Sequence, residues 1–176
     1  LFEEKISNLF GKKYGVFVNS GSSAVLLALE SLNLNKNEIN EIITPACTFI
    51  TTVSPIIQCG LKPVFCDVNI GDYVANLENF KNLINKNTKV LLLPNLIGNK
   101  PDWKEIRNYL KKININDIIL LEDSADTITY TQETDISITS FYASHIITAG
   151  GTGGMVMFNS KKLEERCKMF RDWGRT

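Results

Sequence analysis

The chain contains one histidine, His145, which closely follows the stretch Ser140-Phe141-Tyr142. An imidazole titrates near neutral pH, so this side chain can accept and return a proton under physiological conditions. It cannot form an imine with an aldehyde, because it has no primary amine. A single histidine is more often a structural residue than a catalyst, so its neighbours must decide between the two interpretations.

Two adjacent carboxylates, Glu122 and Asp123, end a run of isoleucine and leucine. A carboxylate at the end of a buried strand can pair with a cationic ring nitrogen of a ligand. A helix cap or a structural hydrogen bond explains an isolated acid equally well. Both interpretations stay open at this point.

Small polar residues gather in the segment Asn19-Ser20-Gly21-Ser22-Ser23, between a predicted strand and a predicted helix. The N–H groups, hydroxyls and dipole of a helix start can bind a phosphate. When such a segment is considered alone, an N-cap with a tight turn is a more common role for it than phosphate binding.

Two further segments follow predicted strands or precede them. In Pro45-Ala46-Cys47-Thr48-Phe49, the ring of Phe49 either lies flat on a ligand ring or packs in the core, which is the commoner place for a lone aromatic. The glycine cluster at 150–154 lacks the Lys-Ser/Thr ending of a P-loop, so we interpret it as a flexible turn.

Short apolar runs alternate with stretches of helical spacing, and this alternation predicts an α/β domain with a largely parallel sheet. The predicted strands cover residues 14–18, 41–44, 62–67, 89–94, 118–122, 136–141 and 155–158. The predicted helices cover residues 22–32, 51–59, 77–84, 103–112 and 161–170. Ligands of such sheets bind at the carboxyl ends of the strands, where most of these polar segments lie.

Length and composition are those of one packed domain, with 176 residues of which 44% are hydrophobic. Lys and Arg total 19, as do Asp and Glu, so we expect neither nucleic acid nor a membrane as a partner. No apolar run approaches the roughly 20 residues of a membrane span, and the start lacks the regions of a signal peptide. The first residue is Leu1 instead of methionine, and we expect a fragment of a longer protein.

The four cysteines are scattered along the chain, without a CxxC pair: Cys47, Cys59, Cys66 and Cys167. This pattern is typical of free thiols in a reducing compartment and not of a disulfide framework or a zinc site. We therefore expect a cytoplasmic protein without a metal centre formed by these residues.

Several segments, read together, resemble the sugar aminotransferase (DegT/DnrJ/EryC1/StrS) family. They are Asn19-Ser20-Gly21-Ser22-Ser23-Ala24, Pro45-Ala46-Cys47-Thr48-Phe49, Pro63-Val64-Phe65-Cys66-Asp67-Val68, Glu122-Asp123-Ser124-Ala125 and Ser140-Phe141-Tyr142. The resemblance covers nearly the whole chain. It implies the large domain of fold type I, the aspartate-aminotransferase-like fold, with a mainly parallel sheet and pyridoxal phosphate at its strand ends. Residues 1–176 would form part of this domain, without the C-terminal small domain.

The lysine that binds the cofactor covalently in this family falls at His145. With the following Ile146-Ile147-Thr148-Ala149-Gly150-Gly151 and the later Arg171-Asp172-Trp173-Gly174-Arg175, the histidine resembles the branch of 4-keto-6-deoxysugar 3-dehydratases. These enzymes make 3,6-dideoxysugars, as found in the O-antigen of lipopolysaccharide. The resemblance thus implies a retained cofactor and a changed reaction.

The resemblance also implies individual roles. The cofactor-binding residues would be Gly21, Ser22 and Ser140 at the phosphate, Asp123 at the pyridine nitrogen, Phe49 on the ring, and Asp126 beside the phenolic oxygen or the reacting centre. His145 would be the catalytic base.

Without a lysine, the cofactor is expected to be held noncovalently and to work mainly as pyridoxamine phosphate. The substrate would be a nucleotide-linked 4-keto-6-deoxyhexose that loses its C3 hydroxyl, with His145 moving the proton. Within the branch, either glutamate regenerates the amine form or an iron–sulfur cluster and a reductase deliver electrons. The cluster cysteines would follow the segment Arg171-Asp172-Trp173-Gly174. A homodimer is expected, as in the family.

Two alternatives remain beside this hypothesis. The first is an ordinary sugar aminotransferase that uses another lysine, although Lys161 and Lys162 lie too far along the chain to replace His145. The second is a noncatalytic relative that binds a nucleotide sugar. Joint retention of Ser22, Asp123 and Ser140 favours an enzyme.

Overall fold

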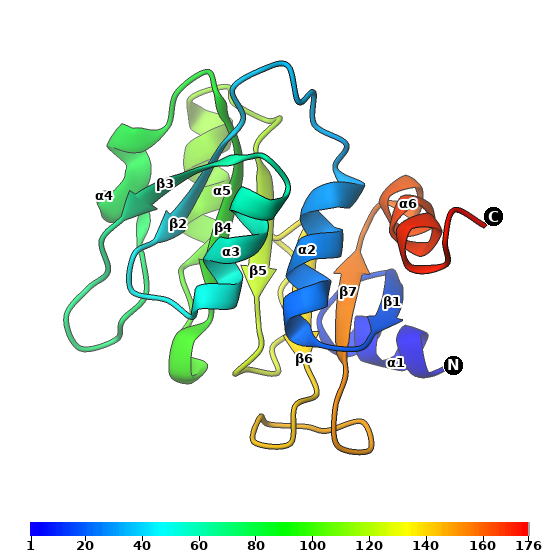
Figure 1. Ribbon diagram of the computed structural model, residues 1–176. Coiled ribbons are helices and arrows are strands. Elements are labelled where there is room, and N and C mark those ends of the chain that lie inside the picture. The colour runs from blue at the N-terminus through cyan, green and yellow to red at the C-terminus, as the bar shows by residue number, and fades with distance from the viewer. Residues whose placement is uncertain (176) are drawn as a thin grey trace.

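The structure is a computed structural model that describes residues 1–175 (Figure 1). A seven-stranded sheet forms its centre, in the order β1-β7-β6-β5-β4-β2-β3. The strands are β1 (Tyr14–Val18), β2 (Glu41–Pro45), β3 (Lys62–Cys66), β4 (Thr88–Pro94), β5 (Ile119–Asp123), β6 (Ile136–Ser140) and β7 (Gly154–Phe158). The helices are α1 (Phe2–Leu9), α2 (Gly21–Ser31), α3 (Ile50–Gln58), α4 (Leu77–Phe80), α5 (Trp103–Lys112) and α6 (Lys161–Arg171), with 3₁₀ turns η1 (Lys81–Leu83) and η2 (Leu96–Gly98).

The direction of β7 organises the sheet. β7 runs antiparallel to both of its neighbours, β1 and β6, while β2 to β6 pair in parallel. Ser140 at the end of β6 therefore lies opposite Gly154 at the start of β7. The carboxyl ends of the parallel strands and the amino end of β7 share one edge, and the loop that carries His145 joins β6 to β7 there.

Helices cover both faces of the sheet, with α2 and α3 in front of it and α5 behind it in Figure 1. Alternate residues of β4 face the two sides, as the pleat of a strand requires. Val90 and Leu92 pack in the cluster with α2, α3 and α6, whereas Leu91 and Leu93 pack in the cluster with α4 and α5. All four side chains are fully buried, so β4 reads as a continuous apolar run.

The α/β class and the mainly parallel sheet predicted from the sequence are confirmed. The ranges predicted for β1 and α5 match the structure to the residue. The prediction of one helix over 77–84 was wrong, because α4 ends after Phe80 and a 3₁₀ turn follows. Helix α1 was not predicted; it packs Ile6 beside Phe10, Met155 and Met157.

No helix in residues 1–175 is long and apolar enough to cross a membrane. The four cysteines are free, and Cys47 alone of them is exposed. Burial raises the pKa of the Cys59 and Cys167 thiols to about 12, so these two act as small apolar side chains.

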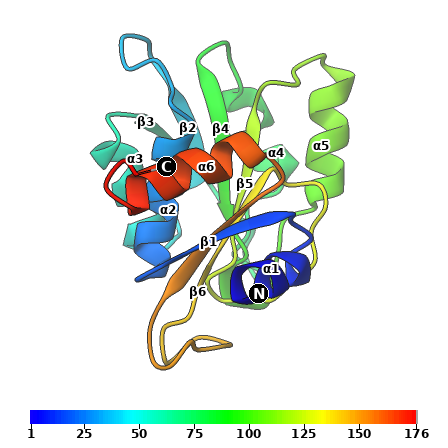
Figure 2. The same ribbon diagram turned by 90° about the vertical axis from the view of Figure 1, so that its right-hand side faces the viewer.

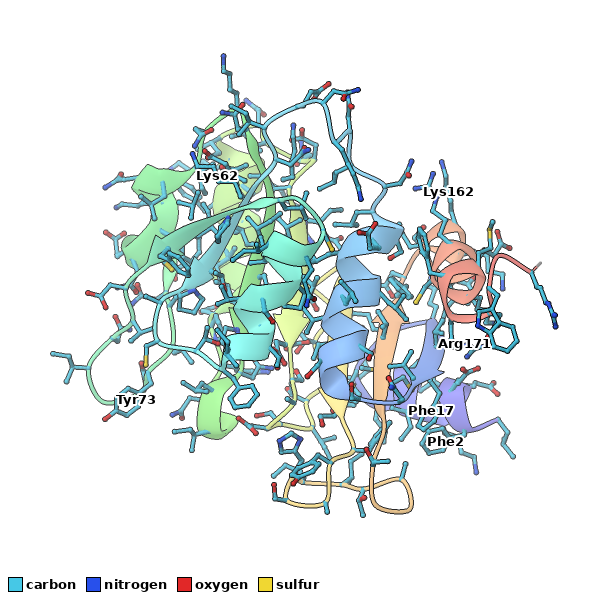
Figure 3. All side chains as sticks on the ribbon, viewed as in Figure 1. Phe2, Phe17, Lys62, Tyr73, Lys162 and Arg171 are labelled. Carbon is cyan, nitrogen blue, oxygen red and sulfur yellow. The ribbon has the colours of Figure 1, made fainter. Side chains whose placement is uncertain are left out.

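Arg171 joins the last helix to the first helix and strand, and Figure 3 shows it near Phe17. Its Nη1 donates to Glu3 Oε1 at 3.0 Å and to Phe17 O at 3.2 Å. Glu3 Oε1 in turn accepts from Phe17 N at 2.7 Å. In Figure 2, β1 accordingly lies between α6 and α1, and the arginine fixes all three elements.

We predict that Arg171→Leu lowers stability by about 1 to 3 kcal/mol, because it removes charge-assisted hydrogen bonds to Glu3 and Phe17. Calorimetric melting of the chain checks this. Arg175→Leu is the matched control, since Arg175 is exposed and lies only over the ring of Trp173; it should change stability by about 0.5 kcal/mol or less. Equal melting temperatures for the wild type and Arg171→Leu would contradict the assignment.

Candidate functional site

The start of α2 and the end of β6 approach each other closely at the carboxyl edge of the sheet. A Cβ atom added to Gly21 would lie 2.8 Å from Ser140 Cβ, which is closer than side chains tolerate. A Cβ on Gly154 would lie 2.3 Å from the backbone of Ser20. Glycine is thus required at both positions for the helix start to reach Ser140.

The first turn of α2 presents polar groups at this edge. Ser20 is the N-cap, and its Oγ accepts from Ser23 N at 3.1 Å. The other amides of a first helical turn have no partner within the helix. Ser22 is exposed beside them, and Ser140 is buried with its Oγ accepting from Tyr142 N at 3.2 Å. The arrangement can bind an anion such as a phosphate.

Asp123 ends β5 with its carboxylate on the face covered by α3. Its Oδ2 accepts from Thr52 Oγ1 at 2.8 Å and its Oδ1 from Ala125 N at 3.2 Å. Burial raises the pKa of the Asp123 carboxyl; the bonds from Thr52 and Ala125 lower it in part. No cationic side chain within residues 1–175 forms an ion pair with it. A buried carboxylate without a cation suits a ligand that carries a positive charge.

His145 lies in the loop after β6, close to Asp126. Its Nε2 is 3.8 Å from Asp126 Oδ1, and its ring meets the Tyr142 ring edge to face at 5.7 Å. The His145 side chain is 26% exposed and that of Asp126 is 42% exposed, so both reach solvent. His145 Nδ1 is buried and has no hydrogen-bond partner in the described part of the chain.

Phe49 is not a core residue, because 69% of its surface is exposed. It stands at the N-cap position of α3, and its carbonyl accepts from Thr52 N at 2.9 Å. Since Thr52 also binds Asp123, the start of α3 lies at the same edge. The Phe49 ring is therefore exposed at this edge.

Three of the lysines lie near the opposite edge. Lys161 and Lys162 begin α6, beyond the end of β7, and Figure 3 shows Lys162 far from the loop between β6 and β7. Lys12 precedes β1; it is buried and donates to Phe10 O at 3.3 Å and to Thr131 O. None of these three can take the place of His145 without a rearrangement of the fold.

Two residues of the site were given no role in it from the sequence. Thr52 was counted only as part of a helix, although it binds Asp123 from 71 positions away. Asn95 is 1% exposed and contacts the segment around Asp123. No spacing pattern marks either residue, because each contact joins elements that are distant in sequence.

The mainly parallel sheet, with a polar helix start and a buried carboxylate at its carboxyl edge, has the fold of the large domain of pyridoxal-phosphate-dependent aminotransferases. The model of the DegT/DnrJ/EryC1/StrS aminotransferase family matches residues 1–176. The chain belongs to this family.

Three relatives illustrate the range of the family. The chain is 36% identical to dTDP-4-dehydro-2,6-dideoxy-D-glucose 3-dehydratase of Saccharopolyspora spinosa, in a match that covers 99% of this chain and 40% of that protein. It is 28% identical to GDP-perosamine synthase of Vibrio cholerae, over 98% of this chain and 47% of that protein. The solved GDP-4-keto-6-deoxy-D-mannose-3-dehydratase of Escherichia coli with bound hydrated pyridoxal phosphate is 31% identical, with a TM-score of 0.82, over 93% of this chain and 44% of that one. The chain thus spans less than half the length of these relatives.

The groups at this edge fit pyridoxal or pyridoxamine phosphate. The cofactor has a phosphate for the start of α2 beside Ser140, and a ring nitrogen that is cationic when protonated, for Asp123. The close approach of Gly21 to Ser140 and the burial of the Asp123 carboxyl, which raises its pKa, are features that such a ligand would use.

We predict that Asp123→Asn makes the cofactor-free chain less sensitive to rising pH. Because burial raises the folded-state pKa of Asp123, its proton stabilises the fold fully below the ordinary aspartate pKa of about 3.9. This stability is lost as the pH rises through the raised pKa. The melting temperature of Asp123→Asn minus that of the wild type should therefore increase as the pH rises above about 4.

Thermal melting of both proteins across this range checks the sign. Asp117→Asn, which changes an exposed acid, serves as the control and should melt in parallel with the wild type. Parallel curves for Asp123→Asn as well would show that burial does not hold a proton on Asp123.

Proposed function

We propose that the full-length protein is a pyridoxamine-phosphate-dependent 3-dehydratase of nucleotide-linked 4-keto-6-deoxyhexoses, in the synthesis of 3,6-dideoxysugars. The observation that carries this proposal is His145 in the loop after β6, where the family's covalent lysine belongs. The resemblance to the Saccharopolyspora and Escherichia 3-dehydratases supports it. Residues 1–176 would form part of the large domain, and a small domain would lie outside this sequence.

The chain's residues would hold the cofactor without a covalent bond. Gly21, Ser22 and Ser140 would bind the phosphate, Asp123 would pair with the ring nitrogen, and Phe49 would cover one face of the ring. When bound, pyridoxamine phosphate supplies an amine that condenses with a keto group and a ring that accepts electrons. An ionised Asp123 strengthens this electron acceptance, because it keeps the ring nitrogen protonated.

His145 would move the proton in the reaction. Its imidazole would take up a proton from C4′ of the cofactor as a general base and would return it to the C3 hydroxyl of the sugar, which leaves as water. Asp126, whose Oδ1 is 3.8 Å from Nε2, stabilises the imidazolium while it carries the proton and restrains the orientation of the ring. His145 would thus be the base, and Asp126 would support it.

The resemblance to GDP-perosamine synthase supports a second candidate, a sugar aminotransferase. That reaction would need a lysine at the cofactor, and the family position carries His145 instead. A noncatalytic nucleotide-sugar-binding protein is the third candidate. It gives no reason for Ser22, Asp123 and Ser140 to be present together at one edge.

The partners of the full-length protein also belong to this proposal. We expect a homodimer in the cytoplasm, with a nucleotide sugar as substrate. After dehydration, either glutamate regenerates the amine or a reductase acts through an iron–sulfur cluster outside this sequence.

Incubation of the full-length protein with a panel of nucleotide-linked 4-keto-6-deoxyhexoses tests the reaction type. In the presence of pyridoxamine phosphate and glutamate, at least one sugar should lose its 3-hydroxyl, as detected by mass spectrometry of the product. A product that carries a new amino group at C4 and keeps the 3-hydroxyl would assign an aminotransferase instead.

We predict that His145→Asn reduces dehydration about 10²- to 10⁴-fold, because asparagine cannot accept a proton near neutral pH. The rate of water loss under saturating cofactor measures the effect. Lys162→Ala is the matched control and should leave the rate unchanged, since Lys162 lies at the opposite edge. In the wild type, borohydride should trap no lysyl adduct. Undiminished turnover in His145→Asn would remove His145 from the mechanism.

A further inference from the structure

Asn95 follows β4 directly and is almost fully buried, with 1% of its surface exposed. Both its backbone and its side chain bind the segment from Glu122 to Thr127. This segment carries the two acids of the proposed site, Asp123 and Asp126. Asn95 itself has no role in the proposed reaction.

The backbone of Asn95 holds the segment at two points. Its N–H donates to Asp123 O at 2.8 Å, which continues the parallel pairing of β4 and β5 beyond Pro94. Its carbonyl accepts from Thr127 Oγ1 at 3.2 Å. Asp126 therefore lies in a short loop between two contacts to one residue.

The side chain of Asn95 holds the same segment from the opposite face. Its Nδ2 donates to Glu122 Oε1 at 2.8 Å and to Ser124 Oγ at 2.7 Å. These two acceptors fix the orientation of the amide, because a flipped amide would turn its oxygen toward the carboxylate. The Oδ1 atom is left without a hydrogen-bond partner in the part of the chain that the structure describes. An unsatisfied buried acceptor is destabilising, so stability alone does not account for this geometry.

Glu122, which accepts from the Asn95 amide, is itself held firmly in place. Its carboxylate is fully buried and points to the face opposite Asp123, as neighbouring strand residues do. Besides Asn95, it accepts from Thr131 Oγ1 at 2.8 Å and from Ser137 Oγ at 2.7 Å. The acceptor for the Asn95 amide is thus held by β6 and by the loop that leads to it.

Displacement of this segment would move both acids of the proposed site. The Asp123 carboxylate would lose its alignment with Thr52, which is 2.8 Å away. The Asp126 carboxylate would change its distance to His145 Nε2, which is 3.8 Å. The position of both acids therefore depends on the contacts of Asn95.

We propose that Asn95 is a positioning residue, which sets the Asp123 carboxylate for a cationic ring nitrogen and, through Thr127, sets Asp126 beside His145. This inference rests on the proposed function. It assigns a role to Glu122 as well, as the anchor of the Asn95 amide.

Two substitutions in the full-length protein separate the two halves of the proposal. Asn95→Leu removes the amide contacts to Glu122 and Ser124, and it should weaken binding of pyridoxamine phosphate about tenfold or more. Thr127→Val removes only the hydroxyl that binds the Asn95 carbonyl. It should leave cofactor binding unchanged and lower kcat about tenfold, and Thr127→Ser should restore kcat.

The measurements are a fluorescence titration of the cofactor-free protein with pyridoxamine phosphate, the steady-state rate and the melting temperature. Thr129→Val is the control in the same loop, because its hydroxyl contacts only the exposed Lys100; it should behave as the wild type. If Asn95→Leu lowers the melting temperature and the folded protein binds pyridoxamine phosphate as tightly as the wild type, Asn95 is only structural and the proposal fails. Unchanged kcat in Thr127→Val would overturn the part that concerns Asp126. A wild type that binds no pyridoxamine phosphate would overturn the proposed function and this inference together.

Discussion

The buried charge of Asp123 is the constraint on which the site depends. A carboxylate in this position is unfavourable unless donors and a cation compensate for its lost hydration. The chain supplies two donors, from Thr52 and Ala125, but no side chain within residues 1–175 forms an ion pair with Asp123. A protonated pyridine ring would supply the missing cation. The unfavourable burial of the Asp123 carboxylate in the free protein would then favour binding of the cofactor.

The fold brings distant segments to this charge from several directions. Helix α3 contributes Thr52, the end of β4 contributes Asn95, and the loop after β6 contributes His145. The reversal of β7 makes that loop begin and end at the carboxyl edge, where Ser140 and Gly154 lie beside the start of α2. Glu122 and Asp123 are neighbours in β5, and their side chains point to opposite faces of the sheet. One acid can therefore organise the scaffold while the other faces the site.

Local patterns in the sequence predicted much of this fold. The apolar run of β1 and the helical spacing of α5 define their bounds without help from tertiary contacts. Helix α1 was missed because Leu1, at its N-cap position, gives no capping signal, and because the helix depends on packing against Phe10 and Met155. The residue types of the site were predicted from strand ends and from the family resemblance. The contacts of Thr52 and Asn95 could not be, since they follow from strand order and not from spacing.

The protonation state of the bound ring nitrogen tests the central claim most directly. Nitrogen NMR of the full-length protein with pyridoxamine phosphate labelled with ¹⁵N in the ring would report it. The account predicts a protonated nitrogen in the wild type at pH values where the free cofactor has lost that proton, and its loss in Asp123→Asn. A neutral ring nitrogen in the wild type, or the same signal in both proteins, would contradict the pairing of Asp123 with the cofactor.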